Sequence, residues 1–521
     1  MERRKFLKTG VLAAMATTAC FAQASLASAQ GSPDILTIAS PAGFPDLDPA
    51  TSFSNDGAVL ANAYETLTRY VPDMSGGSGT VEPVLAESWS SSDDGLTWTF
   101  RLRGGVSFSD GAEFNAASVK ASIERTQAIG GGAAFIWSPV EAIETPDDMT
   151  VVMKLAWPQP MDVTASAGFA AWIMSPNAVD KDNAWFNAGN SAGTGPYVIS
   201  RYEPGQRLIM ERNKGYWGGD AGGFENIVFE IIEDSVLAQS MLESGQADWA
   251  TNLPFENIAG LEARPGVTAH VNPSFQNLFG LLNVRRPPLD DVRVRRALAL
   301  AFPYDDVIAA GTEGLGSRSM GIIPPGIWGH DTDAPVPSTD LAAAKALLDE
   351  AAVSDVALTM TYGTGDALQQ LAGELWRANL SALGIDLVLQ PMAWEAQWEL
   401  AKANPETAQD IFVMYWWPTY VTPYDFLFSL FNSEDEPFFN LGYYSNPEFD
   451  AVLDEANVLS NSDRAASEER FRQANRVVVE DAAAVFMLDM PNVHFTRSDI
   501  EGYVDNPAYG HVVFANELRR N

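Results

Sequence analysis

The fold class is decided by residues 226–251, NIVFEIIEDSVLAQSMLESGQADWAT. Apolar side chains alternate along Asn226–Ile232, which predicts a β-strand. Ser235 can cap a following helix, Gly245 can end it, and Ala247–Thr251 resumes an extended run. A strand, a helix and a second strand in this order form the building block of a parallel sheet, so the stretch predicts an α/β protein.

The same alternation of strands and helices continues on both sides of this stretch. Further strands are predicted at Ile35–Ser40, Trp98–Arg103, Tyr197–Tyr202, Gln206–Arg212, Ala357–Tyr362, Ile385–Met392, Asp410–Trp416 and Ala484–Met490. Helices are predicted at Asp290–Phe302, Thr339–Ala352 and residues 368–383, and after caps at Asn446 and Ser462. These strands are too many for one simple sheet. Two α/β lobes that face each other across a cleft are the economical interpretation, and small ligands bind in such clefts.

The first 29 residues are typical of a secretory signal peptide. Basic residues at positions 3, 4, 5 and 8 precede an uncharged run, Thr9–Phe21, and small residues surround a cleavage site after Ala29. The run Arg3–Lys8 matches a twin-arginine export signal, although an ordinary secretion signal with a chance arginine pair stays open. Lipidation at Cys20 is a less favoured alternative, because the preceding residues lack a large aliphatic side chain. We therefore expect an exported, periplasmic protein.

Cysteine content and charge exclude several classes of function. Cys20 is the only cysteine, so a chain cleaved after Ala29 has no disulfide, thiolate metal site or cysteine nucleophile. The net charge is −36, and the basic leader makes the mature chain more negative still. Such a surface repels phosphate backbones and anionic lipids, which argues against nucleic acid as a partner. Beyond the leader, no apolar stretch is long enough to predict a membrane span.

Motifs of enzyme chemistry are absent from the sequence. It contains no Gly-rich phosphate loop, metalloprotease motif, nucleophile elbow or dinucleotide fingerprint. Its four histidines, His270, His330, His494 and His511, are far apart in sequence and lack helical metal-ligand spacing. We interpret them as structural, and we predict no catalytic residue, no metal and no cofactor.

Aromatic side chains cluster in one region of the sequence. Trp394 and Trp398 lie four residues apart, and core packing is the favoured interpretation for Trp398. The segment Trp416–Tyr424 combines two tryptophans and two tyrosines with Pro418 and Pro423. The prolines argue against a regular strand, and large aromatics on an irregular segment at a strand end often line a cleft.

Several motifs in order resemble the family 5 extracellular solute-binding proteins, which include the oligopeptide, dipeptide and nickel binders of ABC importers. The first is AESW at 86–89, followed by DDGLTWTF at 93–100, LRGGV at 102–106 and FSDG at 108–111. GTGPY at 193–197, ERN at 211–213, YWGG at 216–219, RRPPLDDVRVR at 285–295 and YSNPEFD at 444–450 follow. The resemblance covers nearly the whole mature chain.

This resemblance implies an α/β, two-lobed periplasmic-binding-protein-like fold. Residues 33–278 would form the first lobe with an extra subdomain, residues 279–487 the second lobe, and residues 488–521 a return to the first. Hinge strands would cross between the lobes near Gln276–Val284 and Phe486–Val493. The lobes would close on a small polar solute, and a monomer would deliver it to the permease subunits of an ABC importer.

One departure from the family pattern bears on the ligand. Peptide-binding members carry an acid that pairs with the ligand's ammonium group, where this chain has Thr419, and Thr422 replaces the next family acid. An oligosaccharide or another non-peptide solute is therefore the first expectation, and a di- or oligopeptide, with Asp425 as a shifted acid, is the alternative. Nickel and an exported hydrolase are less favoured. The predicted ligand-binding residues are Trp394, Trp416, Trp417, Thr419 and Tyr420 of the second lobe, with Phe53, Asn55 and Asn440.

Overall fold

The computed structural model describes residues 34–521 except 74–78, 220–222, 252 and 355. The predicted signal peptide, its arginine pair and Cys20 lie outside the described residues. Within the described part, no helix combines the length and apolar character that crossing a membrane requires.

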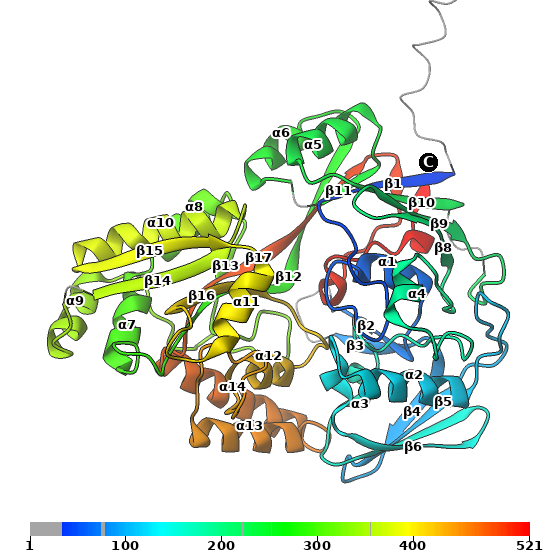
Figure 1. Cartoon of the computed structure of the whole chain (residues 1–521), viewed down its shortest axis with the longest axis horizontal. Coiled ribbons are helices and arrows are strands. Elements are labelled where there is room, and N and C mark those ends of the chain that lie inside the picture. Colours follow the sequence, from blue (N-terminus) through cyan, green and yellow to red (C-terminus); the bar gives the residue numbers. More distant parts are fainter. Residues whose placement is uncertain (1–33, 74–78, 220–222, 252, 355) are drawn as a thin grey trace, which may run out of the picture.

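Two long antiparallel strands, β12 (Val267–Leu282) and β17 (Ala484–Arg497), run through the centre of the largest sheet. They pair from Val267 opposite Arg497 to Leu281 opposite Ala484. Figure 1 shows them crossing from one half of the molecule to the other. The predicted crossing segments fall largely within these two strands, so the two-lobed arrangement with hinge strands is confirmed.

The other strands of this sheet divide between its two ends. At one end β12 is followed by β16 (Ile411–Trp416), β14 (Val356–Gly363) and β15 (Ile385–Met392). At the other end β17 is followed by β11 (Trp249–Thr251), β1 (Ile35–Ser40), β10 (Asn226–Ile231), β9 (Arg207–Arg212) and β8 (Tyr197–Glu203). Following the predicted division, we call residues 34–278 and 488–521 lobe 1 and residues 279–487 lobe 2; these boundaries stay a prediction.

The stretch that predicted the fold class forms β10, α5 (Ser235–Ser244) and β11, as expected. β1 lies between the two strands and is parallel to both, which makes the unit a crossover in a parallel sheet. Asp234, not the predicted Ser235, caps α5: its carboxylate accepts hydrogen bonds from the amides of Val236 and Leu237. Gly245 ends the helix with φ 75°, a left-handed conformation that glycine adopts without strain.

Lobe 1 contains a separate four-stranded antiparallel sheet, the predicted extra subdomain. Its strands are β4 (Ala86–Ser91), β5 (Thr97–Leu102), β7 (Thr150–Leu155) and β6 (Val140–Asp147), with α2 (Ala116–Ile129) packed nearby. The alternation read in β5 is confirmed, because Trp98, Phe100 and Leu102 are buried. A short hairpin, β2 (Thr68–Val71) and β3 (Thr80–Pro83), and the helices α1 (Gly57–Ala63), α3 (Met161–Thr164), α4 (Asn183–Asn187) and α6 (Ile258–Glu262) complete this lobe.

Lobe 2 surrounds its three strands with helices. These are α7 (Val292–Ala301), α8 (Tyr304–Gly311), α9 (Leu341–Glu350), α10 (Ala367–Ala382), α11 (Trp394–Ala403), α12 (Pro423–Phe431), α13 (Pro447–Leu459) and α14 (Arg464–Glu480). Asn446 caps α13 as predicted, but Asp463 rather than Ser462 caps α14. Lobe 2 also contains the short strand β13 (Ser317–Arg318). The remaining short elements lie in lobe 1: the strands β18 (Ile500–Glu501) and β19 (Arg519–Arg520) and turns of 3-10 helix at 134–137, 255–257, 507–509 and 515–517.

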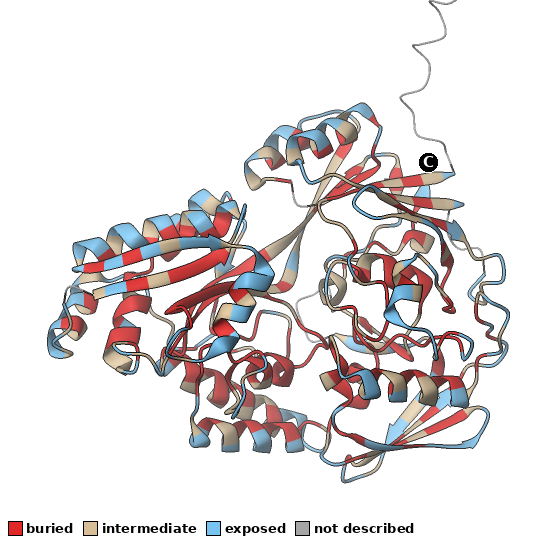
Figure 2. Ribbon diagram, in the orientation of Figure 1, coloured by how far each residue is buried: buried red, intermediate tan, exposed pale blue. Residues whose placement is uncertain are grey.

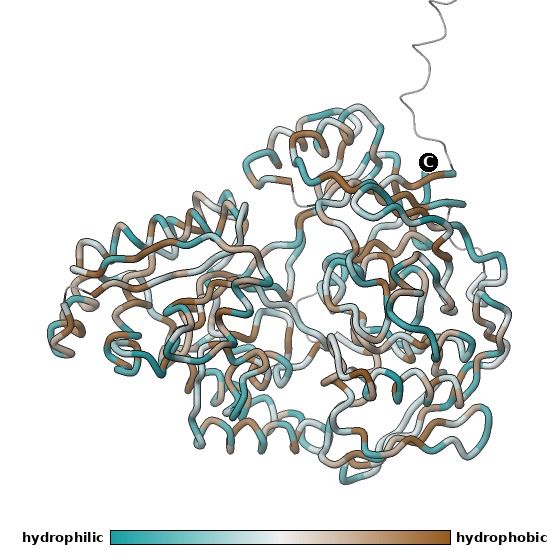
Figure 3. The backbone as a smooth tube through the Cα atoms, in the orientation of Figure 1, coloured by the Kyte–Doolittle hydropathy of each residue, from teal (hydrophilic) through white to brown (hydrophobic). Residues whose placement is uncertain are grey.

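The apolar interior follows the sheets. Buried residues line the inner faces of the strands and helices (Figure 2), and hydrophobic positions recur along the strands of the large sheet (Figure 3). Trp249 in lobe 1 and Trp376 in lobe 2 are fully buried. The C-terminal segment packs onto lobe 1, where the Asn62 amide donates to the carbonyl of Val513 and accepts from the amide of Ala515.

Candidate ligand-binding site

The segment between β16 and α12, residues 417–422, lies against both lobes. The ring of Trp416, at the end of β16, lies 4.9 Å from the ring of Phe439 in lobe 2. Trp417 and Tyr420 instead pack against the core of lobe 1, and Trp417 lies 5.0 Å from the ring of His511 in the C-terminal segment. Successive aromatic residues of one segment therefore contact opposite lobes.

A second aromatic contact joins the lobes directly. The Phe53 ring lies 5.2 Å from Phe169 within lobe 1 and 5.9 Å from Phe439 of lobe 2. Phe439 also lies 5.6 Å from Phe135 and 5.5 Å from Trp398. Most of these pairs are edge-to-face, the arrangement that the quadrupole of an aromatic ring favours. The lobes thus meet through rings, in a closed arrangement.

The lobes also touch at a second place. The Asn457 amide of α13 donates a hydrogen bond of 3.0 Å to the carbonyl of Pro158 in lobe 1. Nearby, burial raises the pKa of Asp162 while the positive charge of Arg464, from lobe 2, acts to lower it. These polar contacts and the aromatic contact join the two lobes, and the segment 417–422 packs against both of them.

The remaining predicted residues have different surroundings. Trp394 is 48% exposed at the start of α11, with its ring 5.5 Å from Trp398 and 5.9 Å from Phe412. Asn55 is half-buried in the loop that carries Phe53. Asn440 is buried, and its amide group donates to the carbonyls of Asn432 and Tyr444 and accepts from the amide of Tyr444. Its polar atoms thus form hydrogen bonds within residues 432–444. Its role in ligand binding stays a prediction.

Asp425 lies directly behind Thr419. Its Oδ2 accepts a hydrogen bond of 2.9 Å from the Thr419 amide, and its side chain is almost completely buried. Its Oδ1 has no hydrogen-bond partner among the described residues. Burial raises the pKa of this carboxyl to about 8, although the Thr419 amide and the side chains of Thr419 and Trp416, which lie close to the carboxyl, act to lower it. A buried acid six residues later in the chain thus lies against Thr419.

Thr422 caps the helix that carries Asp425. Its hydroxyl accepts a hydrogen bond of 3.2 Å from the Asp425 amide and so caps α12. Pro423 occupies the first turn, where its missing N–H is no loss. The cap fixes the backbone that places Asp425 beside Thr419.

Sequence reasoning missed Phe135, Phe438 and Phe439. Phe438 and Phe439 lie in the irregular segment 432–446, next to Pro437, so the criterion that selected Trp416–Tyr424 applies to them as well. The ring of Phe438 lies 6.0 Å from Phe135 across the lobes. Nothing in the sequence around Phe135 distinguishes it from an ordinary core residue.

Three of the four histidines come together in space, because the charges of both His511 and His270 act on the pKa of His494. His270 and His494 pair across β12 and β17, and both rings lie close to Trp249. Burial is the largest cause that lowers the pKa of His494 to about 3, so this imidazole is neutral. Among the described residues, no group of three or more His, Cys, Asp or Glu side chains is arranged to hold a metal ion.

Buried carboxyl groups elsewhere share the raised pKa of Asp425. Burial raises the pKa of Asp56, Glu65 and Asp489 to about 7 in each case. Each therefore binds more protons in the folded than in the unfolded state between its unfolded pKa near 4 and about pH 7. Their contribution to the free energy of unfolding falls as pH rises through this window.

We expect Asp489→Asn to reduce this pH dependence. Asp489 accepts a hydrogen bond of 2.7 Å from the Ser319 hydroxyl, which asparagine can still accept, but asparagine cannot ionise. Between pH 5 and 7, the wild-type chain should lose about 2 kcal/mol more of unfolding free energy than the variant, since one pKa unit corresponds to ~1.4 kcal/mol. Urea unfolding at a series of pH values measures this. Parallel curves would contradict the assignment.

Comparison with known proteins places this geometry in a family. Residues 80–438 match the bacterial extracellular solute-binding proteins, family 5 Middle. The chain belongs to this family of solute-binding proteins. Such proteins are binding components of ABC importers and not enzymes, so the hydrolase alternative has no support. The expected delivery of a bound solute to permease subunits agrees with membership of this family.

Relatives cover nearly the full length of this family member. The chain is 30% identical over 494 residues to the probable D,D-dipeptide-binding periplasmic protein DdpA of Escherichia coli (strain K12), with 94% of each chain covered. It is 27% identical over 515 residues to the glutathione-binding protein GsiB of Pectobacterium atrosepticum, covering 97% of this chain and 96% of that one.

Solved structures confirm the two-lobed fold. The periplasmic binding protein DppA from Helicobacter pylori, in complex with the peptide STSA, has a TM-score of 0.82 at 23% identity, covering 93% of this chain and 98% of that chain. AgaA from A. tumefacien R10, in complex with agropinic acid, has a TM-score of 0.82 at 22% identity, covering 94% and 99%. The oligosaccharide hypothesis and the twin-arginine route find no support in these comparisons, whereas the peptide alternative does.

Proposed function

We propose that the chain binds a peptide-like solute with a free amino group in the cleft between its lobes and delivers it to the permease of an ABC importer. The observation that carries this proposal is the buried Asp425 carboxylate behind Thr419. The names of the relatives, which refer to D,D-dipeptides and glutathione, support the same class of ligand. We further propose that the protein acts as a monomer in the periplasm, in line with its periplasmic relatives.

The chemistry of Asp425 fits an ammonium group. A buried ammonium without a counter-charge costs several kcal/mol, and the hydroxyl of Thr419 carries no charge. Asp425 offers a carboxyl group that has no cation beside it among the described residues, and its neighbours are the neutral side chains of Thr419 and Trp416. An ammonium group near Oδ1 would return the carboxyl to its ionised form, because an opposite charge favours that form.

The aromatic residues around this acid fit the remainder of such a ligand. Trp417 and Tyr420 contact lobe 1 although they belong to a segment of lobe 2. A solute held between them touches both lobes only when the lobes are closed. Closure is then favoured by the ligand's better binding to the closed state, as a hinge mechanism requires.

Titration calorimetry with a matched panel tests the proposal. The panel contains D-alanyl-D-alanine, L-alanyl-L-alanine and glutathione, the N-acetylated form of each, and maltotriose. We expect at least one free-amino ligand to bind, and its N-acetyl form to bind at least tenfold more weakly. Binding of maltotriose alone, or equal binding of free and acetylated peptides, would overturn the proposal.

We expect Trp417→Ala to weaken binding of the free-amino ligand by more than about 1 kcal/mol, since the variant loses a stacked aromatic side chain. Trp185→Ala is the matched control, because Trp185 lies on α4 next to Phe186 and has no ring contact with lobe 2 among the described residues. An unchanged dissociation constant for Trp417→Ala would remove Trp417 from the site.

A further inference from the structure

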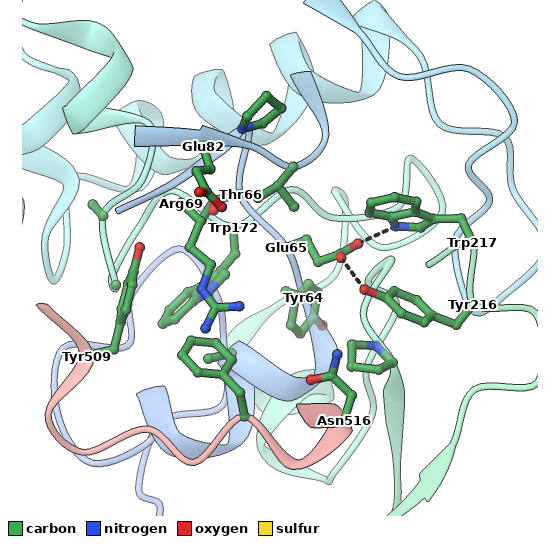
Figure 4. A pocket seen from close by; sticks show the side chains of 17 residues that line it. Tyr64, Glu65, Thr66, Arg69, Glu82, Trp172, Tyr216, Trp217, Tyr509 and Asn516 are labelled. Atoms are coloured by element: carbon green, nitrogen blue, oxygen red, sulfur yellow. Dashed lines mark hydrogen bonds between the residues drawn. The ribbon is translucent and has the colours of Figure 1, made fainter. Parts of the chain in front are cut away.

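A cavity of about 240 Å³ lies within lobe 1, apart from the segment 417–422 and from Asp425. Figure 4 shows its walls: Tyr64 and Trp172 lie at the back, Tyr216 and Trp217 on one side, and Tyr509 on the other. All of its lining residues come from lobe 1, including the C-terminal return. The volume is below the ~300–1,000 Å³ typical of pockets for drug-sized ligands, so the cavity suits a compact molecule.

Opposite charges stand on two sides of this cavity, with Arg69 and its exposed strand partner Glu82 on one side and Glu65 on the other. The Arg69 guanidinium lies 3.7 Å from the centre of the Phe514 ring, and its NH1 pairs with Glu517 at 2.6 Å. This pair is about one third exposed on both side chains and therefore weak. No other hydrogen bond from the guanidinium is found among the described residues, which leaves donors for a second carboxylate in the planar geometry that suits one.

Glu65 faces the cavity from the other side. Its carboxylate accepts hydrogen bonds from the Tyr216 hydroxyl at 2.9 Å, the Trp217 indole at 2.7 Å and the Thr194 hydroxyl at 2.7 Å. All three donors are neutral, and Glu65 forms no ion pair within the described part of the chain. Burial raises its pKa to about 7, although its three hydrogen bonds and the positive charge of Arg103, which lies over the Trp217 ring, act to lower it. An ammonium group in the cavity would favour the ionised form further.

We propose that this cavity is a second binding site, which takes a small zwitterion of amino-acid size. The carboxylate of the ligand binds Arg69 and its ammonium group binds Glu65. The aromatic walls contact an apolar side chain and favour the cationic group through their faces. A singly charged molecule satisfies only one of the two protein charges, so the site distinguishes zwitterions from simple acids and amines.

Titration of L-leucine against two matched analogues tests this site. L-leucinamide keeps the ammonium group without the carboxylate, and 4-methylpentanoate keeps the carboxylate without the ammonium group. The protein used is the full-length mature chain carrying Asp425→Asn, so that binding of a free amine in the cleft is removed. We expect leucine to bind at least tenfold more tightly than either analogue. Absence of leucine binding, or equal binding of all three, would overturn the proposal.

Variants of the two charged residues locate the binding. Adding Arg69→Gln or Glu65→Gln should each weaken leucine binding at least tenfold. Arg69→Gln removes only the weak ion pair with Glu517, so we expect this variant to fold. It therefore tests the site even if Glu65→Gln does not fold. In an otherwise wild-type chain, Arg69→Gln should leave the affinity for the free-amino peptide of the panel unchanged. Leucine binding that survives both substitutions would refute the second site and leave the proposed function unaffected. Absence of peptide binding in the panel would refute the proposed function and leave the second site unaffected.

Discussion

Asp425→Asn is expected to weaken binding of a free-amino dipeptide at least 100-fold, or about 3 kcal/mol. The substitution removes the one charge that lies against Thr419 and leaves the ligand's ammonium group without a counter-charge in a buried site. The affinity for the N-acetylated peptide should stay unchanged, because that ligand has no charge to lose. Calorimetry of both ligands with both proteins measures the difference.

Asparagine is the matched replacement for this position. Its amide oxygen can still accept the hydrogen bond from the Thr419 amide, and its backbone amide can still donate to the cap at Thr422. The unliganded variant should therefore unfold at the same urea concentration as the wild type or a higher one at pH 8, because a buried ionised group has been removed. Equal losses of affinity for free and acetylated peptides would mean that Asp425 only shapes the segment.

The same carboxyl predicts how binding varies with pH. Burial raises the pKa of Asp425 to about 8 in the unliganded protein, so at pH 6 the carboxyl is mostly protonated. Binding of an ammonium group requires the ionised form, and the cost of losing that proton decreases as pH approaches 8. Affinity for the free-amino peptide should thus increase from pH 6 to 8 in the wild type and stay flat in Asp425→Asn.

Local chemistry explains which parts of the fold the sequence could predict. The unit β10–α5–β11 follows from strict alternation and a glycine stop, both of which act within a few residues. The predicted helix caps Ser235 and Ser462 are each wrong by one residue. The observed caps, Asp234 and Asp463, are their direct neighbours, and both residue types can cap a helix. The long continuation of β17 past Met490 depends on pairing with β12, more than 200 residues away, which no local pattern contains.

The residues of the candidate site likewise include some that the sequence could predict and some that it could not. Trp416–Tyr424 could be recognised because prolines and aromatics stand together in sequence. The contact of Phe53 with Phe439 joins residues nearly 400 positions apart and exists only because the lobes close. Thr419 suggested a lost acid, and the helix cap at Thr422 turns the chain so that Asp425 lies against Thr419. The closeness of Asp425 to Thr419 depends on this turn, which the residue types alone did not reveal.

Arg125→Met is expected to lower the free energy of unfolding by about 3–5 kcal/mol, because it leaves a buried carboxylate without its partner. Arg125 donates two hydrogen bonds of 2.7 Å, one to each oxygen of Asp48, and the two side chains are 8% and 1% exposed. Asp48 also accepts from the Ala50 amide, which fixes the loop that carries Phe53. The variant should therefore also bind the free-amino peptide more weakly, through a displaced Phe53.

An exposed pair supplies the control for this loss. Arg101 and Asp147 lie 3.8 Å apart with side chains 61% and 56% exposed, so Arg101→Met should cost less than about 1 kcal/mol. The double variant Asp48→Leu, Arg125→Met removes both buried charges and should be more stable than Arg125→Met alone, because no unpaired carboxylate remains. Urea unfolding of the three variants separates the explanations. If the double variant were less stable than Arg125→Met, the hydrogen bond that Asp48 accepts from the Ala50 amide would outweigh the cost of its unpaired charge, and the explanation would fail.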